Sequence, residues 1–366
     1  MPSEKESKSI LFIVNNRKDR SPGQRFRFEQ YLAFLEANGY RCEFSPLLNE
    51  RDDKIFYAPG NYFRKFLILL NSYVKRTGNL LKARNYDAIF VFREAVYTKS
   101  TFFEKQFAKR SKVVFDFDDS IWLQNVSEAN KRFAFLKNAG KTKDIIGYSH
   151  LVIAGNEYLA DYARKFNRNV VIIPTTIDTE EYVRSTNSRK DETVCIGWSG
   201  SKTTIQHFSH AIEALKIVKE KYGNRISIRV IGDENYENKM LEIQGLPWKK
   251  TTEIADLSAI DIGIMPLPDD EWSKGKCGLK GLQYMALEIP TIMSPVGVNS
   301  VIIQDGENGM LAATTEEWVI KLSQLIEDKE LRMRLGKAGR KTVAEGYSVE
   351  ALKNRYLQLF NELIKV

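Results

Sequence analysis

Short apolar runs recur along the chain, and they alternate with segments whose apolar residues repeat at helical spacing. Runs of this kind predict buried strands, and their alternation with helices predicts parallel sheets in an α/β fold. The strands predicted in the first half are Ile10–Asn15, Tyr40–Ser45, Ala88–Phe92, Val113–Phe117, Leu151–Ala154 and Val170–Ile173. Those predicted in the second half are Thr193–Gly197, Ile226–Ile231, Ile262–Met265 and Pro290–Ser294. Helices are predicted at Arg25–Asn38 and Thr203–Lys221.

The length of 366 residues is enough for two domains that each bury a core. The polar and charged stretch Arg184–Glu192 is typical of a linker. We therefore predict a first domain over residues 1–185 and a second over 186–346. The remaining residues, 347–366, form an amphipathic tail whose apolar side carries Leu352, Tyr356, Phe360 and Leu363.

The composition, 43% hydrophobic and 28% charged, is that of an ordinary soluble protein. Cys42, Cys195 and Cys277 are too widely spaced for a disulfide framework or a zinc motif, which favours a reducing compartment. The longest clean aliphatic run, Phe66–Leu70, is far shorter than the roughly 20 residues that a membrane span requires. The polar N-terminus is unlike a secretory signal. We expect a cytoplasmic protein.

The net charge of +8 is unevenly spread. The segment Asn61–Arg84 contains six basic residues and no acid, and between them lie apolar residues at near-helical spacing: Phe63, Phe66, Leu67, Leu70 and Val74. A basic amphipathic segment suits an anionic membrane surface such as the inner face of the plasma membrane. The alternative is a crossover helix that packs these apolar residues on the sheet. No recognised nucleic-acid-binding module accompanies the charge, so we expect no nucleic-acid partner.

The segment Trp272–Asn299 interleaves lysines and glycines at the start of a predicted helix, with Lys274, Lys276 and Lys280 around Gly275, Gly278 and Gly281. Ammonium groups and unpaired backbone amides at a helix N-terminus favour negative charge. The pattern predicts an anion site, and diphosphate is the anion we expect. An ordinary basic surface helix is the alternative.

The same segment, K-G-K-C-G-x-K-x-L-Q-Y-M-A-x-x-I-P followed by S-P-V-G-V-N, resembles the sugar-nucleotide motif of family-4 retaining glycosyltransferases. A thinner resemblance covers most of the chain, and within it a bacterial surface-polysaccharide subgroup matches best. The thinner resemblance is carried by Gly23–Arg27 with Glu29 and Gln30, Val113–Trp122, Ile196–Ser201, Asp261–Trp272 and Asp305–Leu311. Of these segments, Val113–Trp122 and Ile196–Ser201 fit the bacterial subgroup.

The resemblance implies a GT-B fold, with two facing Rossmann-like domains, parallel sheets and a C-terminal helix that crosses back to the first domain. It also implies an enzyme that moves a sugar, in the manner of a hexosyltransferase, from a nucleoside-diphosphate-sugar to an acceptor hydroxyl. The acceptor would be a glycan or a lipid-linked glycan in surface polysaccharide or glycolipid assembly. Lysines would replace the metal that other glycosyltransferases use, so we expect no essential metal and no cofactor.

Ligands of open parallel sheets bind beyond the carboxyl ends of the strands. Gly200, Ser201 and Lys202 follow one predicted strand, where glycine permits close backbone approach and Lys202 can neutralise phosphate. A solvated lysine at a helix start is the alternative for Lys202. Asp233 follows the next strand, and Trp248 occupies the region where family members contact the nucleotide base, either stacking on it or simply packing.

Gly297, Val298 and Asn299 follow the strand of the lysine–glycine motif and can offer amides to a sugar or phosphate. Asn299 is also a candidate helix N-cap. Gln283 stands where much of the family has the second of two glutamates, and it can bond a sugar or ribose hydroxyl without supplying the same charge.

Three further positions depart from the family pattern. Gly275 stands near the place of the first glutamate, and Gly281 and Glu288 stand where leucine and glycine are expected. Cys277 neighbours lysines that would lower its pKa, but without a base beside it we interpret it as a packing residue.

In the first domain, Asp118 and Asp119 follow a predicted strand and are candidates to orient the acceptor hydroxyl or accept its proton. The alternative is a salt bridge with Arg93 or Arg132. The spacing D-x-D-x-S also resembles the opening motif of haloacid-dehalogenase phosphatases, but no partner lysine and second acidic pair follow in order. Arg25 and Arg27 can bind donor phosphates or an acidic acceptor.

We therefore expect a glycosyltransferase in which Lys276 and Lys280 stabilise the leaving diphosphate and Asp118 or Asp119 serves the acceptor. A GT-B sugar-nucleotide epimerase and an inactive scaffold of the same fold are the alternatives. His207 and His210 lie three residues apart, and with only His150 besides them we expect no zinc site.

Overall fold

The computed structural model describes residues 8–123, 138, 140–184 and 193–365. Most of the predicted linker, residues 185–192, and Arg132 lie outside these ranges. The chain divides into two compact units. The first contains the residues up to Thr175 and those from Lys353 on, and the second is Thr176–Leu352. These limits differ from the predicted 185 and 346, because the second unit starts earlier and reaches into the last helix.

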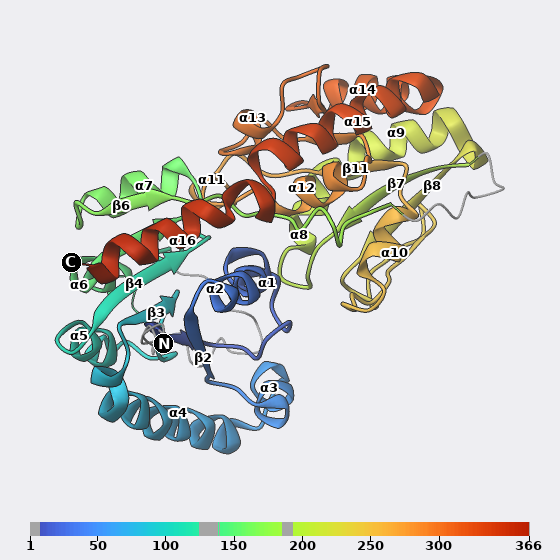
Figure 1. Ribbon diagram of the computed structural model, residues 1–366. Coiled ribbons are helices and arrows are strands. Elements are labelled where there is room, and N and C mark those ends of the chain that lie inside the picture. The colour runs from blue at the N-terminus through green and yellow to red at the C-terminus, as the bar shows by residue number, and fades with distance from the viewer. Residues whose placement is uncertain (1–7, 124–137, 139, 185–192, 366) are drawn as a thin grey trace. The chain divides into compact units, whose positions relative to one another are not determined.

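The first unit contains a six-stranded parallel sheet (Figure 1). Its strands, in the order β2-β1-β3-β4-β5-β6, are β2 (Tyr40–Pro46), β1 (Lys8–Val14), β3 (Ala88–Phe92), β4 (Lys112–Phe117), β5 (Leu151–Ala154) and β6 (Val170–Ile172). The runs Ile10–Val14 and Ala88–Val91 are fully buried, as expected for central strands covered on both faces. The main helices are α1 (Pro22–Arg27), α2 (Leu32–Ala37), α3 (Glu50–Tyr57), α4 (Tyr62–Lys82), α5 (Phe102–Ala108), α6 (Lys141–Tyr148) and α7 (Glu157–Arg164).

The second unit repeats this architecture around a five-stranded parallel sheet. Its order is β13 (Met310–Leu311), β12 (Thr291–Met293), β11 (Ile262–Met265), β7 (Val194–Ser199) and β8 (Ile226–Ile231). A small antiparallel pair, β9 (Glu237–Asn238) and β10 (Ile243–Gln244), follows β8. The helices are α8 (Ile205–Phe208), α9 (Ile212–Tyr222), α10 (Glu253–Ser258), α11 (Glu271–Lys274), α12 (Leu279–Ala286), α13 (Asn299–Ile302), α14 (Thr315–Glu327) and α15 (Lys329–Gly346).

The predicted α/β class with parallel sheets is therefore confirmed in both units. In each sheet the strand order reverses beside its first strand, between β1 and β3 and between β7 and β11. A crevice opens at such a switch point, at the carboxyl ends of the strands. The chemistry-bearing motifs of the sequence should therefore be sought at these two edges.

The last helix, α16 (Val349–Lys365), contributes aromatic side chains to the core of the first unit. Tyr356 stacks on Tyr31 with ring centroids 4.5 Å apart and an interplanar angle of 7°. Phe360 packs against Tyr40, whose hydroxyl donates to Asn361 Oδ1 at 2.9 Å. The apolar side of the tail thus has a buried partner.

Two predicted helices are each broken into two. Residues 25–38 do not form one helix, because Phe28 leaves the helical conformation with φ −142° and its ring packs 5.0 Å from that of Phe90 in the core. Between α8 and α9 lies a 3₁₀ turn, Ser209–Ala211. Side chains three residues apart align in a 3₁₀ turn, and here Phe208 and Ala211 are both fully buried.

The basic segment forms α4, and of the two alternatives the crossover helix with these apolar residues packed on the sheet is wrong. All five of these side chains, Phe63, Phe66, Leu67, Leu70 and Val74, are exposed. The buried side of α4 consists of Ile68 and Leu69 together with Lys65, Ser72 and Arg76. Within the described ranges, no helix is long and apolar enough to cross a bilayer.

Candidate functional site

The lysine–glycine motif lies at the carboxyl edge of the second sheet. Asp270 caps α11, accepting from the Ser273 amide at 2.7 Å, and the chain then turns through residues 275–278 into α12. Gly278 occupies the left-handed region, with φ +71°, and an added Cβ would lie 2.4 Å from Ile302 Cδ1. The helix therefore begins at Leu279, later than the sequence predicted, so Lys274 belongs to α11 and Lys276 to the connecting turn.

Lys276 and Lys280 hold their ammonium groups over indole rings. Lys280 Nζ lies 4.6 Å from the centroid of Trp198 and 3.5 Å from Thr204 Oγ1. Lys276 Nζ lies 4.8 Å from the centroid of Trp272. The ring quadrupole attracts a cation held over an aromatic face and so helps to orient it. The Lys274 ammonium lies 3.5 Å from both Asp269 and Glu271.

The pKa of His207 reflects, in part, the positive charge of Lys276 and Lys280. Burial, with a further contribution from the charges of Lys280 and Lys276, lowers the pKa of His207 to about 4. The side chain on α8 therefore stays neutral at physiological pH while two ammonium groups act on it. No motif in the sequence pointed to this role, since the two histidines three apart were considered only as zinc ligands and no zinc site was expected.

The loops after β7 and β8 touch one another through their backbones. Gly232 has φ +124°, and an added Cβ would lie 2.2 Å from the carbonyl oxygen of Gly200. The Ser201 amide donates to Thr204 Oγ1 at 2.9 Å, which closes the turn before α8. Lys202 Nζ lies 3.7 Å from Asp233 Oδ1, so these two predicted donor-binding residues face each other.

Gln283 is buried in a hydrogen-bonded cluster that the sequence did not reveal. Its Nε2 donates to Glu253 Oε1 and to the Tyr182 hydroxyl, both at 3.0 Å. Tyr182 donates to Glu253 Oε2 at 2.6 Å, and Trp248 Nε1 donates to Glu253 Oε1 at 2.9 Å. The structure thus joins Trp248 and Gln283, two predicted site residues, through the carboxylate of Glu253.

One departure from the family pattern has a local explanation, and a second runs against its own backbone conformation. Met293 fills the space of a larger side chain at Gly281, where an added Cβ would lie 1.7 Å from Met293 Cε. Glu288 has φ +56°, a conformation that favours the glycine expected there. Cys277 is buried, as a packing role predicts.

The turn after β12 presents backbone amides. Within the described residues, the amides of Gly297 and Val298 have no hydrogen-bond partner. Asn299 is the first residue of α13 and not its cap, so the N-cap alternative is wrong. Its Nδ2 donates to Ser294 O at 3.1 Å, and its buried Oδ1 has no partner in the described part of the chain.

In the first unit, Asp118 and Asp119 share one arginine at the carboxyl edge of the sheet. Arg93 Nε donates to Asp118 Oδ1 at 2.8 Å, and Arg93 Nη2 lies 3.0 Å from Asp119 Oδ2. The salt bridge considered from the sequence is therefore present. Arg93 has φ +62°, an unfavourable conformation for a side chain of its size and one that often marks functional sites.

The opening-loop arginines are buried. Arg27 binds Asp116 in a bidentate pair, with both N–O distances 3.0 Å, and also donates to Ile173 O. Its guanidinium is therefore a structural group of the buried core. Arg25 is 6% exposed and its guanidinium lies 4.7 Å from the centroid of Phe26. The loop after β1 is fixed by Gln24, whose side chain exchanges hydrogen bonds with the backbone of Asn16.

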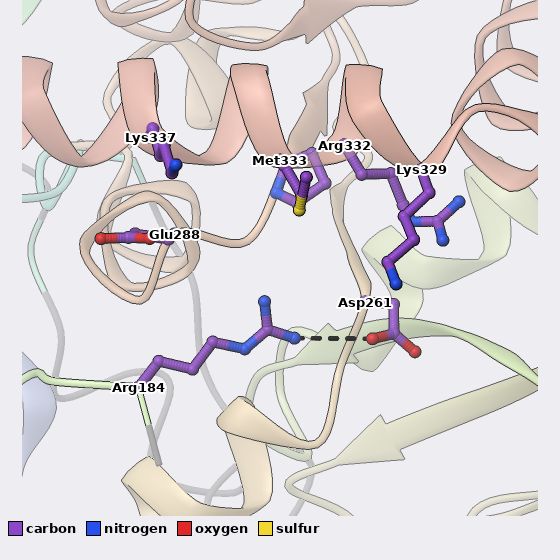
Figure 2. A pocket seen from close by; sticks show the side chains of 8 residues that line it. Arg184, Asp261, Glu288, Lys329, Arg332, Met333 and Lys337 are labelled. Carbon is purple, nitrogen blue, oxygen red and sulfur yellow. Dashed lines mark hydrogen bonds and ion pairs between the residues drawn. The ribbon is translucent and has the colours of Figure 1, made fainter. Parts of the chain in front are cut away.

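A separate hollow of about 310 Å³ lies at the opposite, amino edge of the second sheet, where Asp261 and Pro290 precede β11 and β12 (Figure 2). Arg184 bridges to Asp261 at 3.5 Å, and α15 contributes Lys329, Arg332 and Lys337 to the wall. None of the predicted site residues lines it. Within the described ranges, no group of three or more acidic, histidine or cysteine side chains could hold a metal ion.

The comparisons with known proteins agree with this geometry. Residues 178–342 match the model of the family described as "Glycosyl transferases group 1". Glycosyltransferase 1 domain-containing protein 1 from Xenopus tropicalis is 29% identical over 127 residues, which cover 35% of this chain and 36% of that protein. The chain thus spans about a third of the curated relative it matches.

Solved structures match over nearly the whole chain. Sucrose-phosphate synthase from Thermosynechococcus elongatus superposes with a TM-score of 0.70 at 15% identity, covering 98% of this chain and 99% of that one. Anabaena HepE in complex with UDP and glucose gives a TM-score of 0.68 at 13% identity, covering 97% and 100%.

The fold is therefore that of the GT-B glycosyltransferases, built from two Rossmann-like units, as predicted. Residues 178–342, within the second unit, are thus similar to the group 1 glycosyltransferases.

Proposed function

We propose that the protein is a retaining glycosyltransferase of family 4, of hexosyltransferase type, that moves a sugar from a nucleoside-diphosphate-sugar to an acceptor hydroxyl. The observation that carries the proposal is that the ammonium groups of Lys276 and Lys280 lie over the indole rings of Trp272 and Trp198 at the carboxyl edge of the second sheet. Positive potential at this edge suits a diphosphate. The HepE structures with UDP and UDP-glucose are consistent with such a donor.

In this proposal the second unit stabilises the leaving group. As the anomeric carbon–oxygen bond breaks, negative charge grows on the diphosphate, and the ammonium groups of Lys276 and Lys280 lie ready to receive it. The amides of Gly297 and Val298 supply further donors. These groups take the part that a metal plays in other glycosyltransferases, so we propose that transfer needs no divalent cation and no cofactor.

In the first unit, we assign Asp118 to the acceptor. The acceptor oxygen bonds the anomeric carbon on the face that the diphosphate leaves, and its proton passes late in the step to Asp118 or to the departing phosphate. The Arg93 guanidinium holds Asp118 in place. The family resemblance favours a glycan or lipid-linked glycan acceptor, in surface polysaccharide or glycolipid assembly at the cytoplasmic face of a membrane.

The donor site can be tested by thermal unfolding with UDP, GDP, ADP, CMP or NAD, with and without EDTA. A ligand that binds only the native state at a hundredfold excess over Kd adds about 2.7 kcal/mol to the free energy of unfolding. We expect one nucleoside diphosphate to stabilise the protein, EDTA to leave the effect unchanged, and Lys280→Ala to remove most of it. Lys341→Ala, on the exposed side of α15, is the matched control.

The possible outcomes separate the alternatives. Stabilisation by NAD alone would contradict a sugar-nucleotide site. Donor binding with no turnover in any acceptor mixture would favour an inactive scaffold, and conversion of the donor sugar without an acceptor would favour an epimerase.

A further inference from the structure

Helix α4 presents an apolar stripe to solvent. Along the stripe, Phe63 is 73% exposed, Val74 is 70% exposed and Leu81 is 83% exposed. Phe66, Leu67 and Leu70 lie between them and are about half exposed. Figure 1 shows α4 as a long helix at the rim of the first unit. A contiguous apolar surface of this kind marks a binding face more often than a chance arrangement.

The helix cannot bury this stripe by rolling over, because its opposite side is fixed by polar contacts. Arg76 is fully buried, and its guanidinium donates to Val14 O and Ala95 O at 2.8 Å and to Ser45 O at 3.0 Å. These carbonyls belong to the ends of β1 and β2 and to the loop after β3. Removing a guanidinium from three such acceptors would leave buried groups unpaired. The outward stripe is thus built into the fold.

Basic side chains flank the stripe on one side. Arg64, Lys75 and Lys82 are exposed, and their spacings of eleven and seven residues correspond to about three and two helical turns. They therefore lie in one row beside the apolar residues. Residues 61–84 contain no acid. From α3, the carboxylate of Asp52 acts on Lys75.

We propose that this face of α4 docks on an anionic lipid bilayer, with the helix lying in the membrane plane. An apolar stripe inserted at the acyl boundary, with a basic row at the height of the headgroups, is the arrangement that interfacial helices use. The charge of the row selects an anionic lipid surface over a neutral one. The inference depends on α4 alone and would hold whatever sugar the protein transfers.

The test is flotation of the full chain with vesicles of phosphatidylcholine alone or with about a third of the lipid replaced by phosphatidylglycerol, an anionic lipid. We expect strong binding to the anionic vesicles, weak binding to the neutral ones, and release of part of the protein at high salt. Failure to bind anionic vesicles would overturn the proposal. Equal binding to both vesicle types would overturn the role of the basic row.

Two variants distinguish the two parts of the surface. Because each basic group near an anionic surface contributes a factor of about five, Arg64→Glu with Lys82→Glu should weaken binding at least tenfold. Phe63→Ser with Val74→Ser removes two of the three most exposed apolar side chains of the stripe and should have a similar effect. Ile320→Ser, which changes an apolar residue 56% exposed on α14, is the control and should bind as the wild type does.

All these side chains are exposed, so the variants should keep the wild-type melting temperature and nucleotide binding. If the α4 variants bind vesicles like the wild type, the stripe is not the docking surface. The wild type could instead form a dimer and fail to bind vesicles. If Phe63→Ser with Val74→Ser then converts that dimer to a monomer, the face is a protein interface and the proposal is wrong.

Discussion

The side-chain amide of Gln283 donates a hydrogen bond to the carboxylate of Glu253 at 3.0 Å, thirty residues away in the chain. A carboxylate only accepts, so Nε2 must face Glu253 and Oε1 must point away from it. Trp248 and Tyr182 donate to the same carboxylate. The glutamine at the family's glutamate position is therefore matched to an acid that α10 supplies, and the acidic charge of this cluster lies on Glu253.

Replacing Gln283 by the family's glutamate should therefore destabilise the protein. Gln283→Glu places two buried carboxylates within hydrogen-bond distance, and both cannot ionise without a large cost. We expect a loss of about 2–4 kcal/mol in the free energy of unfolding at neutral pH, because a buried charge is left unpaired. The loss should shrink as the pH falls towards about 4.3, the ordinary pKa of glutamate, where the two groups can share a proton.

The double variant Gln283→Glu with Glu253→Gln is the matched control for this prediction. It restores one acid and one amide with their positions exchanged, so much of the lost stability should return in urea denaturation. A single Gln283→Glu variant as stable as the wild type would show that the cluster is looser than the structure indicates.

The lowered pKa of His207 should make the free energy of unfolding depend on pH. Its folded pKa of about 4 lies below the ordinary value of 6.5, so between these pH values the unfolded chain binds a proton that the folded chain does not. The free energy of unfolding should therefore fall as pH is lowered from about 6.5 to about 4, by up to about 3 kcal/mol. His207→Gln, compared with the wild type at each pH, should remove this part of the pH dependence.

A bound diphosphate should raise the pKa of His207, because its negative charge offsets that of Lys276 and Lys280. Titration of the imidazole by NMR, with and without the nucleotide that stabilises the protein, measures this directly. An unchanged pKa on nucleotide binding would place the diphosphate elsewhere.

Replacing Glu288 by glycine should stabilise the protein. Its φ of +56° costs a residue with a Cβ about 1 kcal/mol or more, whereas glycine adopts it freely. The side chain is half exposed, and its oxygen lies 3.9 Å from Arg340 Nε, so little is lost with it. Because glycine also gains entropy in the unfolded chain, we expect Glu288→Gly to gain about 0.5–1 kcal/mol.

The control for this variant is Glu288→Ala, which removes the carboxylate and keeps the strained backbone. Thermal unfolding should show a gain for Glu288→Gly alone. An equal gain from both variants would trace the effect to the charge and not to the backbone conformation.

The strands and their carboxyl-edge motifs could be predicted from the sequence because runs such as Ile10–Val14 must be buried wherever they occur. The side towards which α4 turns its apolar stripe could not be predicted from the sequence. Its periodicity locates a stripe at Phe63 and Val74, but the outward direction follows from the contacts of Arg76 with three distant carbonyls. Likewise, no spacing along the chain connects Gln283 to Glu253, since only the packing of α10 beside α12 brings them together.

Asp118 offers the sharpest test of the acceptor assignment. If Asp118 accepts the acceptor proton, Asp118→Asn should lower kcat by about 10²–10⁴-fold and leave nucleotide binding unchanged. The asparagine side chain has the shape of aspartate and keeps one oxygen that can accept from Arg93. Asp119 still pairs with that guanidinium at 3.0 Å. The melting temperature should therefore change little.

Asp119→Asn is the matched control, since it also removes one carboxylate from Arg93. If Asp118 serves only the salt bridge, the two variants should behave alike, with activity within a few-fold of the wild type and a similar small loss of stability. A large loss of kcat in Asp118→Asn alone, together with a changed pH profile in the remaining activity, is the result that a proton-accepting role requires. A loss confined to KM for the acceptor would instead make Asp118 a binding residue.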